Sequence, residues 1–316
     1  MIEGIHHITA LASDPQQNVD FYTDVLGLRL VKRTVNFDAQ DVYHLYYGDE
    51  VGRPGTILTF FPFPHAVRGK RGTGEISAVA FVVPEGSLDF WLMRLSRFDI
   101  HIDGPENRYN EQVISFQDPD GMEIELMVGP SQAPYRTWSG GPIPRQYAIE
   151  KLHGATLLLG RLDETDRLLQ KTLGFKFVGG AGKRYRYTIG TDTDVAVVDL
   201  IVEPELSPAR QSAGSVHHIA WRVADRSLQA QWRKKLLETG LHTTEILDRK
   251  YFESVYFREP GGVLFEIATD GPGFVIDEPI QELGTHLELP KWLESERPRL
   301  ERILLPIKLK TRPALW

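Results

Sequence analysis

Residues 4–11 read GIHHITAL, and residues 215–222 read SVHHIAWR. Each stretch places two adjacent histidines inside a run of apolar residues, which is the composition of a buried β-strand. The two stretches lie near opposite ends of the chain. An unusual motif that occurs twice in one chain indicates an internal repeat, and repeats of this kind decide the fold.

Two further β-rich runs, ISAVAFVV at residues 76–83 and LHGATLLL at residues 152–159, are similar to the histidine-bearing runs and give four repeats. An amphipathic stretch follows each run, as in FYTDVLGL at residues 21–28, and in three repeats it closes on a glycine followed by an apolar residue. A glycine there suits the left-handed C-cap of a helix. Each repeat is therefore expected to begin with a strand and a helix.

The second and fourth repeats end in matching hairpins, ISFQDPDGMEIELMV at residues 114–128 and VYFREPGGVLFEIAT at residues 255–269. Pro and Gly at their centres are typical of a tight turn between two strands. The common pattern is strand, helix and three strands. We therefore predict an α+β fold of four βαβββ modules that form two cupped mixed β-sheets with the helices outside.

The predicted modules span residues 5–64, 75–128, 149–203 and 215–270. The first two make up an N-terminal half, residues 1–148, and the last two a C-terminal half, residues 149–272. In the remaining tail, residues 273–316, the stretch LPKWLESERPRLERILLPI predicts a helix whose aromatic and apolar residues pack into the core.

The composition restricts the function. The chain has 316 residues, a net charge of −7 and no cysteine. Disulfides, thiolate metal sites and cysteine nucleophiles are excluded, so any metal must be bound by His, Asp, Glu or backbone oxygen. Basic residues form only short clusters, which argues against a nucleic-acid partner. The sequence shows neither a signal peptide nor an apolar run long enough to span a bilayer, so we expect a cytoplasmic protein without a membrane partner.

The repeats act as internal controls for the histidines. At the second position of the histidine pair the four modules carry His7, Ala78, Gly154 and His218. Ala and Gly serve at this position in two modules, so the fold does not require histidine there. A role beyond packing is indicated for His7 and His218.

A carboxylate completes the set, because Glu266 lies on the last strand of the fourth module. His7, His218 and Glu266 are the ligand set of non-haem Fe(II) sites that leave positions open for substrate and dioxygen. Manganese is chemically close to iron, and zinc uses the same residue types in hydrolytic sites, so the ligands alone do not name the metal. Glu125 occupies the same position in the second module without histidines to serve, which shows that a glutamate there can also be structural.

Alternation along a strand predicts which side chains act together. His7 and Thr9 share a face, whereas His6 and His217 start on the opposite face unless the strand bulges. Only pairing of the first module with the fourth gathers the three candidate ligands. We therefore expect these two modules to share a cup that holds the metal, and the second and third modules to form a metal-free cup.

These motifs together resemble the vicinal oxygen chelate superfamily of glyoxalases, bleomycin resistance proteins and dioxygenases, whose fold pairs βαβββ units around a metal site. More narrowly, they resemble the hydroquinone ring-cleaving dioxygenases, the group of 2,6-dichlorohydroquinone 1,2-dioxygenase. The resemblance covers nearly the whole chain. It is carried by HHIT at residues 6–9, HHIA at residues 217–220, DRKYFESVYFREPGG at residues 248–262 and LFEIAT at residues 264–269.

The resemblance implies an Fe(II)-dependent oxidoreductase, with Mn(II) as the alternative metal, that cleaves hydroquinone-type aromatic diols with O2. It implies that His217 and Tyr256 are catalytic groups that handle protons. Arg249 would bind the substrate and steady the developing anion, Thr9 would line the same pocket, and His6 would lie close behind. The ring substituents, the degradative or detoxifying role and a homo-oligomeric state stay open.

Three other functions stay open as well. A glyoxalase-like isomerase or lyase adds a fourth protein ligand from the last strand of the partner module, and residues 56–63, TILTFFPF, offer neither carboxylate nor histidine. A catechol-type extradiol dioxygenase with its site in the third and fourth modules would need histidine at Gly154, and His153 is one position away. A metal-free binding or resistance protein would leave the three candidate ligands unexplained.

Overall fold

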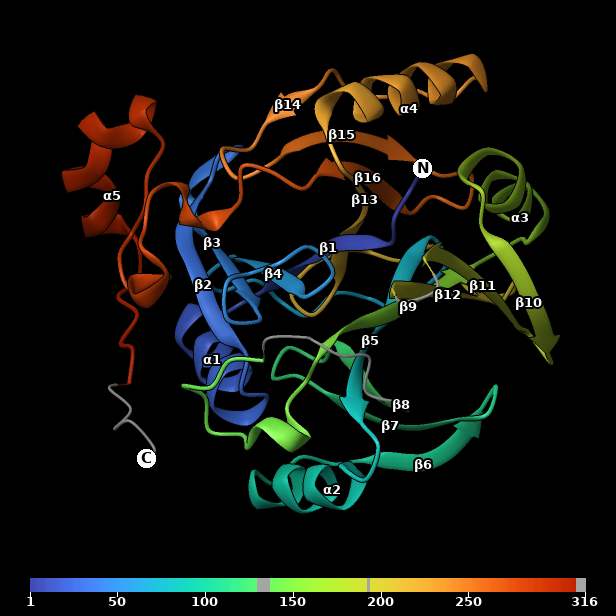
Figure 1. The fold of residues 1–316 in the computed structure, drawn as a ribbon, viewed down its shortest axis with the longest axis horizontal. Coiled ribbons are helices and arrows are strands. Elements are labelled where there is room, and N and C mark those ends of the chain that lie inside the picture. Colours follow the sequence, from blue (N-terminus) through green and yellow to red (C-terminus); the bar gives the residue numbers. More distant parts are fainter. Residues whose placement is uncertain (130–136, 192–193, 311–316) are drawn as a thin grey trace.

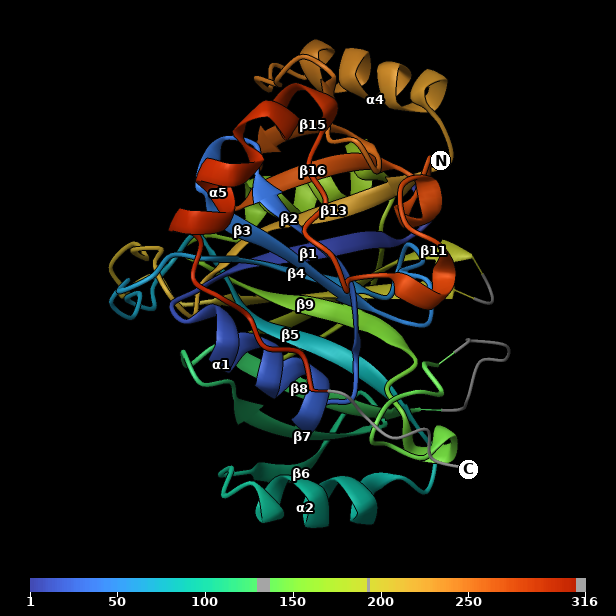
Figure 2. The ribbon, with the colours of Figure 1, turned by 90° about the vertical axis from the view of Figure 1, so that its left-hand side faces the viewer.

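The computed structural model describes residues 1–129, 137–191 and 194–310. Two mixed eight-stranded sheets dominate this part of the chain (Figure 1, Figure 2). In spatial order, the first sheet contains β14 (Leu247–Asp248), β15 (Glu253–Arg258), β16 (Leu264–Thr269), β13 (Val216–Val223), β1 (Ile5–Ala12), β4 (Ile57–Pro62), β3 (Ala39–Gly48) and β2 (Arg29–Asn36). The second contains β10 (Lys176–Ala181), β11 (Arg184–Thr191), β12 (Asp194–Val202), β9 (Lys151–Leu159), β5 (Glu75–Pro84), β8 (Glu123–Gly129), β7 (Glu111–Gln117) and β6 (Asp103–Arg108).

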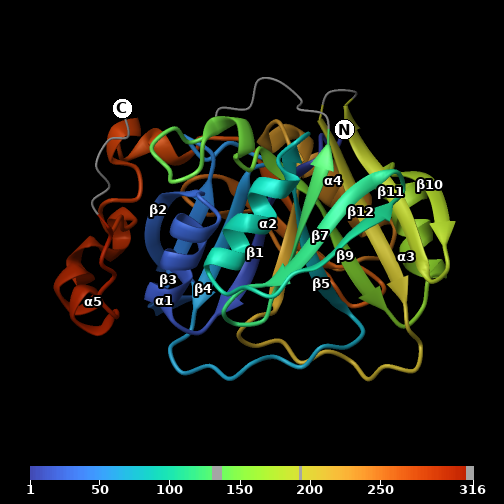
Figure 3. The same cartoon turned by 90° about the horizontal axis from the view of Figure 1, so that it is seen from below.

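Helices follow the first strand of each βαβββ unit and lie outside the curled sheets (Figure 1, Figure 3). The predicted α+β class with two cupped mixed sheets is confirmed. The α-helices are α1 (Pro15–Asp20), α2 (Leu88–Arg97), α3 (Asp163–Arg167), α4 (Arg226–Glu238) and α5 (Arg297–Ile303). π-Helical turns at Phe21–Val25 and Leu168–Leu173 extend α1 and α3, and short 3-10 helices lie at Arg145–Tyr147, Phe274–Ile276, Ile280–Glu282 and Lys291–Glu296.

The helix ends follow from local sequence. Asp14 caps α1 by accepting a hydrogen bond from the backbone N–H of Gln17, and Pro15 follows at the first helical position. Asp225 caps α4 in the same way through the N–H of Leu228. The helix of the third unit ends at Gly174, whose φ of +86° is the left-handed conformation expected from the sequence. No helix of the described ranges is long and apolar enough to cross a membrane.

The sheet order joins elements from opposite ends of the chain. β1 pairs antiparallel with β13 and parallel with β4, so strands of the first and fourth units form one sheet. β5 pairs with β9 in the same antiparallel manner in the other sheet. The loops that follow β4 and β12 run side by side below the sheets, joined by backbone bridges such as Lys70↔Arg210 (Figure 3).

The hairpin between β7 and β8 turns around a buried carboxylate. Asp118 accepts hydrogen bonds from the backbone N–H groups of Asp120 and Met122, at 3.0 and 2.8 Å, and from the Tyr22 hydroxyl at 3.0 Å. Burial nevertheless raises the pKa of Asp118 from 3.8 to about 6. The folded chain therefore binds a proton here more tightly than the unfolded chain does.

This shift predicts a pH dependence of stability. The contribution of Asp118 is fully present below pH 4 and is lost as the pH rises through about 6, because only the unfolded carboxyl ionises freely in that window. The loss is about 2–3 kcal/mol. We expect the difference in unfolding free energy between Asp118→Asn and wild type, measured by urea titration, to change by this amount between pH 4 and 7. Asp103→Asn, at an exposed position, serves as the control. If the difference in unfolding free energy from wild type does not change with pH for either variant, the assignment is contradicted.

The segment after β16 is anchored to β2 by a fully buried lysine. Lys32 Nζ lies 2.6 Å from Asp277 Oδ1 and 2.5 Å from Glu278 Oε2, and 5.2 Å from the centre of the Tyr251 ring. The Tyr251 hydroxyl donates to the other oxygen of Asp277, and Lys250 Nζ lies 2.5 Å from that same oxygen. Two carboxylates are thus neutralised by two lysines under the tail.

Further along, the tail runs beside β2, the last strand of its sheet. The N–H of Glu288 donates to the carbonyl of Arg33 at 2.9 Å, and the Arg33 guanidinium donates to the carbonyl of Thr285 at 2.8 Å. Leu293 and Leu300 of the following helical segment are buried as expected. The expectation that the aromatic residue also packs into the core is wrong, because Trp292 is 58% exposed and packs its ring at an angle against the partly buried Phe37.

Candidate metal centre

Three neighbouring strands bring His7, His218 and Glu266 together. His7 on β1 pairs with Ala220 on β13, and Ala220 pairs in turn with Glu266 on β16. His218 lies two residues before Ala220 and so shares its face. Ala220 lies between His7 and Glu266 in the sheet. Because its side chain is small, the His7 imidazole and the Glu266 carboxylate can approach each other above it.

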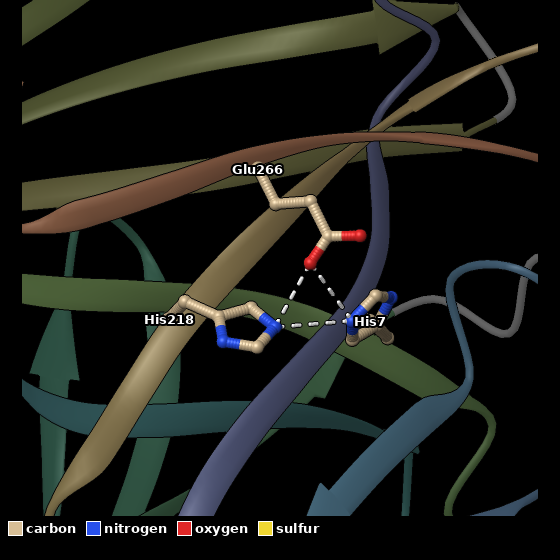
Figure 4. A group of neighbouring side chains, drawn as sticks. All are labelled: His7, His218 and Glu266. Carbon is tan, nitrogen blue, oxygen red and sulfur yellow. Dashed lines mark hydrogen bonds and ion pairs between the residues drawn. The ribbon is translucent and has the colours of Figure 1, made fainter. Parts of the chain in front are cut away.

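Three donor atoms of these residues face one another (Figure 4). Nε2 of His218 lies 2.9 Å from Oε2 of Glu266, and Nε2 of His7 lies 3.5 Å from the same oxygen. The two Nε2 atoms are 3.3 Å apart. All three side chains are buried, and their ligand atoms lie within 4.8 Å of one another, so the group could hold a metal ion.

The chemistry of the donor atoms fits a cation. Burial alone would raise the pKa of Glu266, but His7 and His218 outweigh burial and hold that pKa well below its usual range. Ser254 donates to Oε1 of Glu266 at 2.6 Å, whereas the buried Oε2 accepts no hydrogen bond of good geometry from the described residues. A buried anionic oxygen between two imidazole nitrogens is stable only with a proton or a cation among them.

The histidines that precede each candidate ligand orient it. Nδ1 of His7 lies 2.9 Å from Nδ1 of His6, and Nδ1 of His218 lies 2.7 Å from Nδ1 of His217. If His7 and His218 carry their protons on Nδ1 and donate them to these neighbours, both Nε2 lone pairs point at the centre. Hydrogen bonds of this kind fix the tautomer and the ring plane of metal-binding histidines.

Simple alternation is wrong for His217, and the register of β1 and β13 gives the reason. Thr9 pairs with His218 but the next residue, Ala10, pairs with Val216, so His217 is the extra residue of a β-bulge. His6 is the extra residue of a second bulge, between the Ile5 and His7 pairings. The bulge turns His217 toward the centre, where burial lowers its pKa to about 3 and keeps the ring neutral near neutral pH.

A cavity of about 620 Å³ opens beside the three residues. Its wall includes both histidine ligand candidates and four more residues singled out from the sequence, namely Thr9, His217, Arg249 and Tyr256. His6 does not reach the wall and packs behind His7, with the Phe252 ring 4.9 Å from both imidazoles. The other parts of the wall are mostly apolar and include Leu11, Phe37, Phe61, Phe63, Leu247, Phe252 and Leu264.

Arg249 and Tyr256 form a pair at this wall. Tyr256 pairs with Glu266 across β15 and β16, and the Arg249 guanidinium lies 5.4 Å from the centre of the Tyr256 ring. Asp38 holds the guanidinium at 3.0 Å. Burial raises the pKa of Tyr256 well above its usual value, so the phenol keeps its proton and can donate a hydrogen bond.

Sequence reasoning missed two wall residues on β3, His44 and Tyr46. In the sequence, their spacing of two residues on a strand already indicates that both side chains lie on the same face. The strand register gives a second indication. Tyr46 pairs with Thr59 on β4 as Tyr256 pairs with Glu266 on β16. Thr59 therefore stands in the first unit where Glu266 stands in the fourth, and a hydroxyl occupies the position from which a fourth protein ligand would come.

The equivalent position in the second sheet is neutralised without a metal ligand set. Glu125 pairs with Ala80 and Ser115, as Glu266 pairs with Ala220 and Tyr256. Its Oε1 lies 2.8 Å from the Arg108 guanidinium. The Arg108 guanidinium therefore balances the charge of the Glu125 carboxylate. In the first sheet, the histidines and a bound cation would balance the charge of Glu266.

Gly154 cannot be replaced by histidine in this fold. A Cβ atom at Gly154 would lie 2.1 Å from the carbonyl oxygen of Val197, which is backbone of the neighbouring strand. The adjacent His153 instead lies 3.4 Å from Glu111 in a smaller pocket of the second sheet. These two facts argue against a catechol-type site in the third and fourth units.

Comparison with known proteins identifies the family. A model of the Glyoxalase/Bleomycin resistance protein/Dioxygenase superfamily matches residues 4–126 and 151–267. The chain belongs to this superfamily. Within it, the chain is 44% identical over 307 residues to "Putative ring-cleaving dioxygenase MhqO" of Bacillus subtilis, covering 97% of each protein. It is 36% identical over 311 residues to "Chlorohydroquinone/hydroquinone 1,2-dioxygenase" of Sphingobium indicum, covering 96% of each.

Solved structures share the fold. The crystal structure titled "putative dioxygenase from Bacillus subtilis" superposes with a TM-score of 0.92 at 43% identity, covering 98% of each chain. Glyoxalase I from Zea mays superposes with a TM-score of 0.62 at 16% identity over 84% of this chain and 92% of its own. The latter likeness concerns the fold alone.

Proposed function

We propose that this protein is an Fe(II)-dependent dioxygenase that cleaves the ring of hydroquinone-type aromatic diols and inserts both atoms of O2. The observation that carries the proposal is the convergence of three buried donor atoms beside a 620 Å³ cavity, with Thr59 where a fourth protein ligand would stand. Such a centre leaves positions open for two small reactants. The named activity of the Sphingobium relative supports the same reaction class.

His7, His218 and Glu266 would hold the metal, with Mn(II) as the alternative to Fe(II). The bound ion would supply the Lewis-acid and redox chemistry that allows O2 to react with an aromatic ring. The aromatic and aliphatic side chains of the wall exclude water and match the faces of a diol ring.

Hydrogen-bond donors from the chain surround the place where a diol would bind. The positive charge of Arg249 favours an ionised hydroxyl, and Tyr256 presents a phenol that stays protonated. With Nδ1 of His217 accepting from His218, Nε2 of His217 carries the remaining proton of the neutral ring and can donate it. The cavity is therefore suited to an anionic diol, whose oxygens these groups would hold by hydrogen bonds.

Oxygen uptake tests the function. The metal-free chain is loaded anaerobically with Fe(II) or Mn(II), then given O2 with hydroquinone or catechol side by side. We expect one O2 consumed per hydroquinone, a ring-opened product and little uptake with catechol. Uptake with catechol alone would move the assignment to the catechol-type class, and no uptake with either diol after full metal loading would refute ring cleavage.

A further inference from the structure

A chain of hydrogen bonds crosses three strands and ends beside His7. The Tyr46 hydroxyl lies 2.7 Å from Nδ1 of His44 on β3. Nε2 of His44 lies 2.8 Å from Oγ1 of Thr59 on β4, and Thr59 Oγ1 donates to Oγ1 of Thr9 on β1 at 2.9 Å. The proposed function gives no role to His44, to Tyr46 or to the hydrogen bonds of Thr59.

Counting hydrogens requires that all donors of this hydrogen-bond chain point the same way. A hydroxyl has one hydrogen, so when Thr59 gives its hydrogen to Thr9 it accepts from Nε2–H of His44. A neutral imidazole with its proton on Nε2 accepts at Nδ1, so Tyr46 donates to His44. Burial lowers the pKa of His44 well below its usual value, which agrees with a neutral ring.

In the direction from Tyr46 to Thr9, Thr9 keeps a hydrogen that no other described residue accepts. Thr9 lines the cavity and lies two residues from His7 on the same face of β1, about 6–7 Å along the strand. Three aligned donors behind it polarise its hydroxyl in one direction. The result is a fixed donor, closed to bulk water and adjacent to the candidate metal centre.

We propose that Thr9 donates a hydrogen bond to the ionised phenolic oxygen of the bound diol, and that Tyr46, His44 and Thr59 are positioning residues that set the direction of this donor. The inference rests on the proposed function, since it assumes that a phenolate binds at the centre. A hydroxyl whose single hydrogen points at the ligand gives a stronger hydrogen bond to an anionic oxygen than to a neutral hydroxyl. The hydrogen bonds from Tyr46 through His44 and Thr59 to Thr9 would thereby favour binding of the ionised form of the substrate.

The test uses 4-nitrophenol and Zn(II), so that neither O2 nor ring cleavage is involved. The phenolate of 4-nitrophenol absorbs visible light, and its pKa in the bound state is read by titration of the Zn(II)-loaded chain. We expect Thr9→Val to weaken binding about tenfold and to raise the pKa of the bound probe by about one unit. Thr9→Ser restores both values, and His44→Phe gives a smaller shift in the same direction.

Thr156→Val is the matched control, because Thr156 lies two residues after Gly154 as Thr9 lies two residues after His7. Zinc content is measured for each variant, and Thr9→Ala replaces Thr9→Val if the latter loses zinc. Unchanged or tighter binding by the Thr9 variants would overturn the inference, since tighter binding means that Thr9 presents a lone pair. If wild type itself does not bind the phenolate, the proposed function fails instead.

Discussion

Glu266→Ala is expected to abolish retention of Fe(II), whereas Glu125→Ala retains one equivalent per chain. The two glutamates occupy matching positions in the two sheets, but their partners differ. Glu266 supplies the only negative charge among the three converging donor atoms, so its loss leaves two neutral imidazoles. Glu125 faces the Arg108 guanidinium, so its loss affects an ion pair and not a metal site.

The measurement is metal content after anaerobic loading and gel filtration, with circular dichroism to verify that each variant is folded. His7→Ala and His218→Ala are expected to behave like Glu266→Ala. Glu125→Ala controls for the loss of a buried carboxylate as such. Equal metal content in all four variants would contradict the assignment of the ligands.

Lys32→Met is expected to destabilise the fold by about 3–5 kcal/mol, because it leaves the carboxylates of Asp277 and Glu278 without their buried partner. The remaining contact of Asp277 with Lys250 compensates only part of that charge. Lys310→Met removes a lysine that contacts Asp24 and Asp20 but is 62% exposed, and it should cost less than about 1 kcal/mol.

Denaturant titration of the two methionine variants measures this difference. Combining Lys32→Met with Asp277→Asn and Glu278→Gln should recover part of the loss, because no unpaired charge then stays buried. Similar unfolding midpoints for Lys32→Met and Lys310→Met would show that the buried cluster contributes little to stability.

The fold class could be predicted because the local sequence of each of the four repeats indicates the order of its helix and strands. Glycines after the helices and Pro-Gly turns in the hairpins mark element ends whatever the tertiary context, as Gly174 and the Asp118 turn show. The second repeat also serves as a control, since Ala78 shows that the strand itself does not need histidine, whereas the close approach of Val197 excludes any side chain at Gly154. Local sequence therefore carries both the architecture and the choice of candidate ligands.

Features that depend on register between strands could not be predicted. The bulges that turn His6 and His217 arise because β1 and β13 each place one extra residue in their pairing, and neither strand encodes that alone. His44 acquires meaning only through its contact with Thr59 on another strand. The ion pair between Glu125 and Arg108 joins residues whose spacing in the sequence does not predict a contact. Because of this ion pair, Glu125 differs in role from Glu266 at the matching position.

The tail beside β2 has a consequence for the behaviour of the chain in a crowded solution. β2 is an eight-residue terminal strand whose free backbone groups could otherwise recruit a strand from another molecule. The N–H of Glu288 occupies the carbonyl of Arg33 on that edge, and Leu287 forms a backbone bridge to the same residue. The C-terminal extension thus works as a built-in guard against intermolecular strand addition, a task unrelated to the chemistry in the cavity.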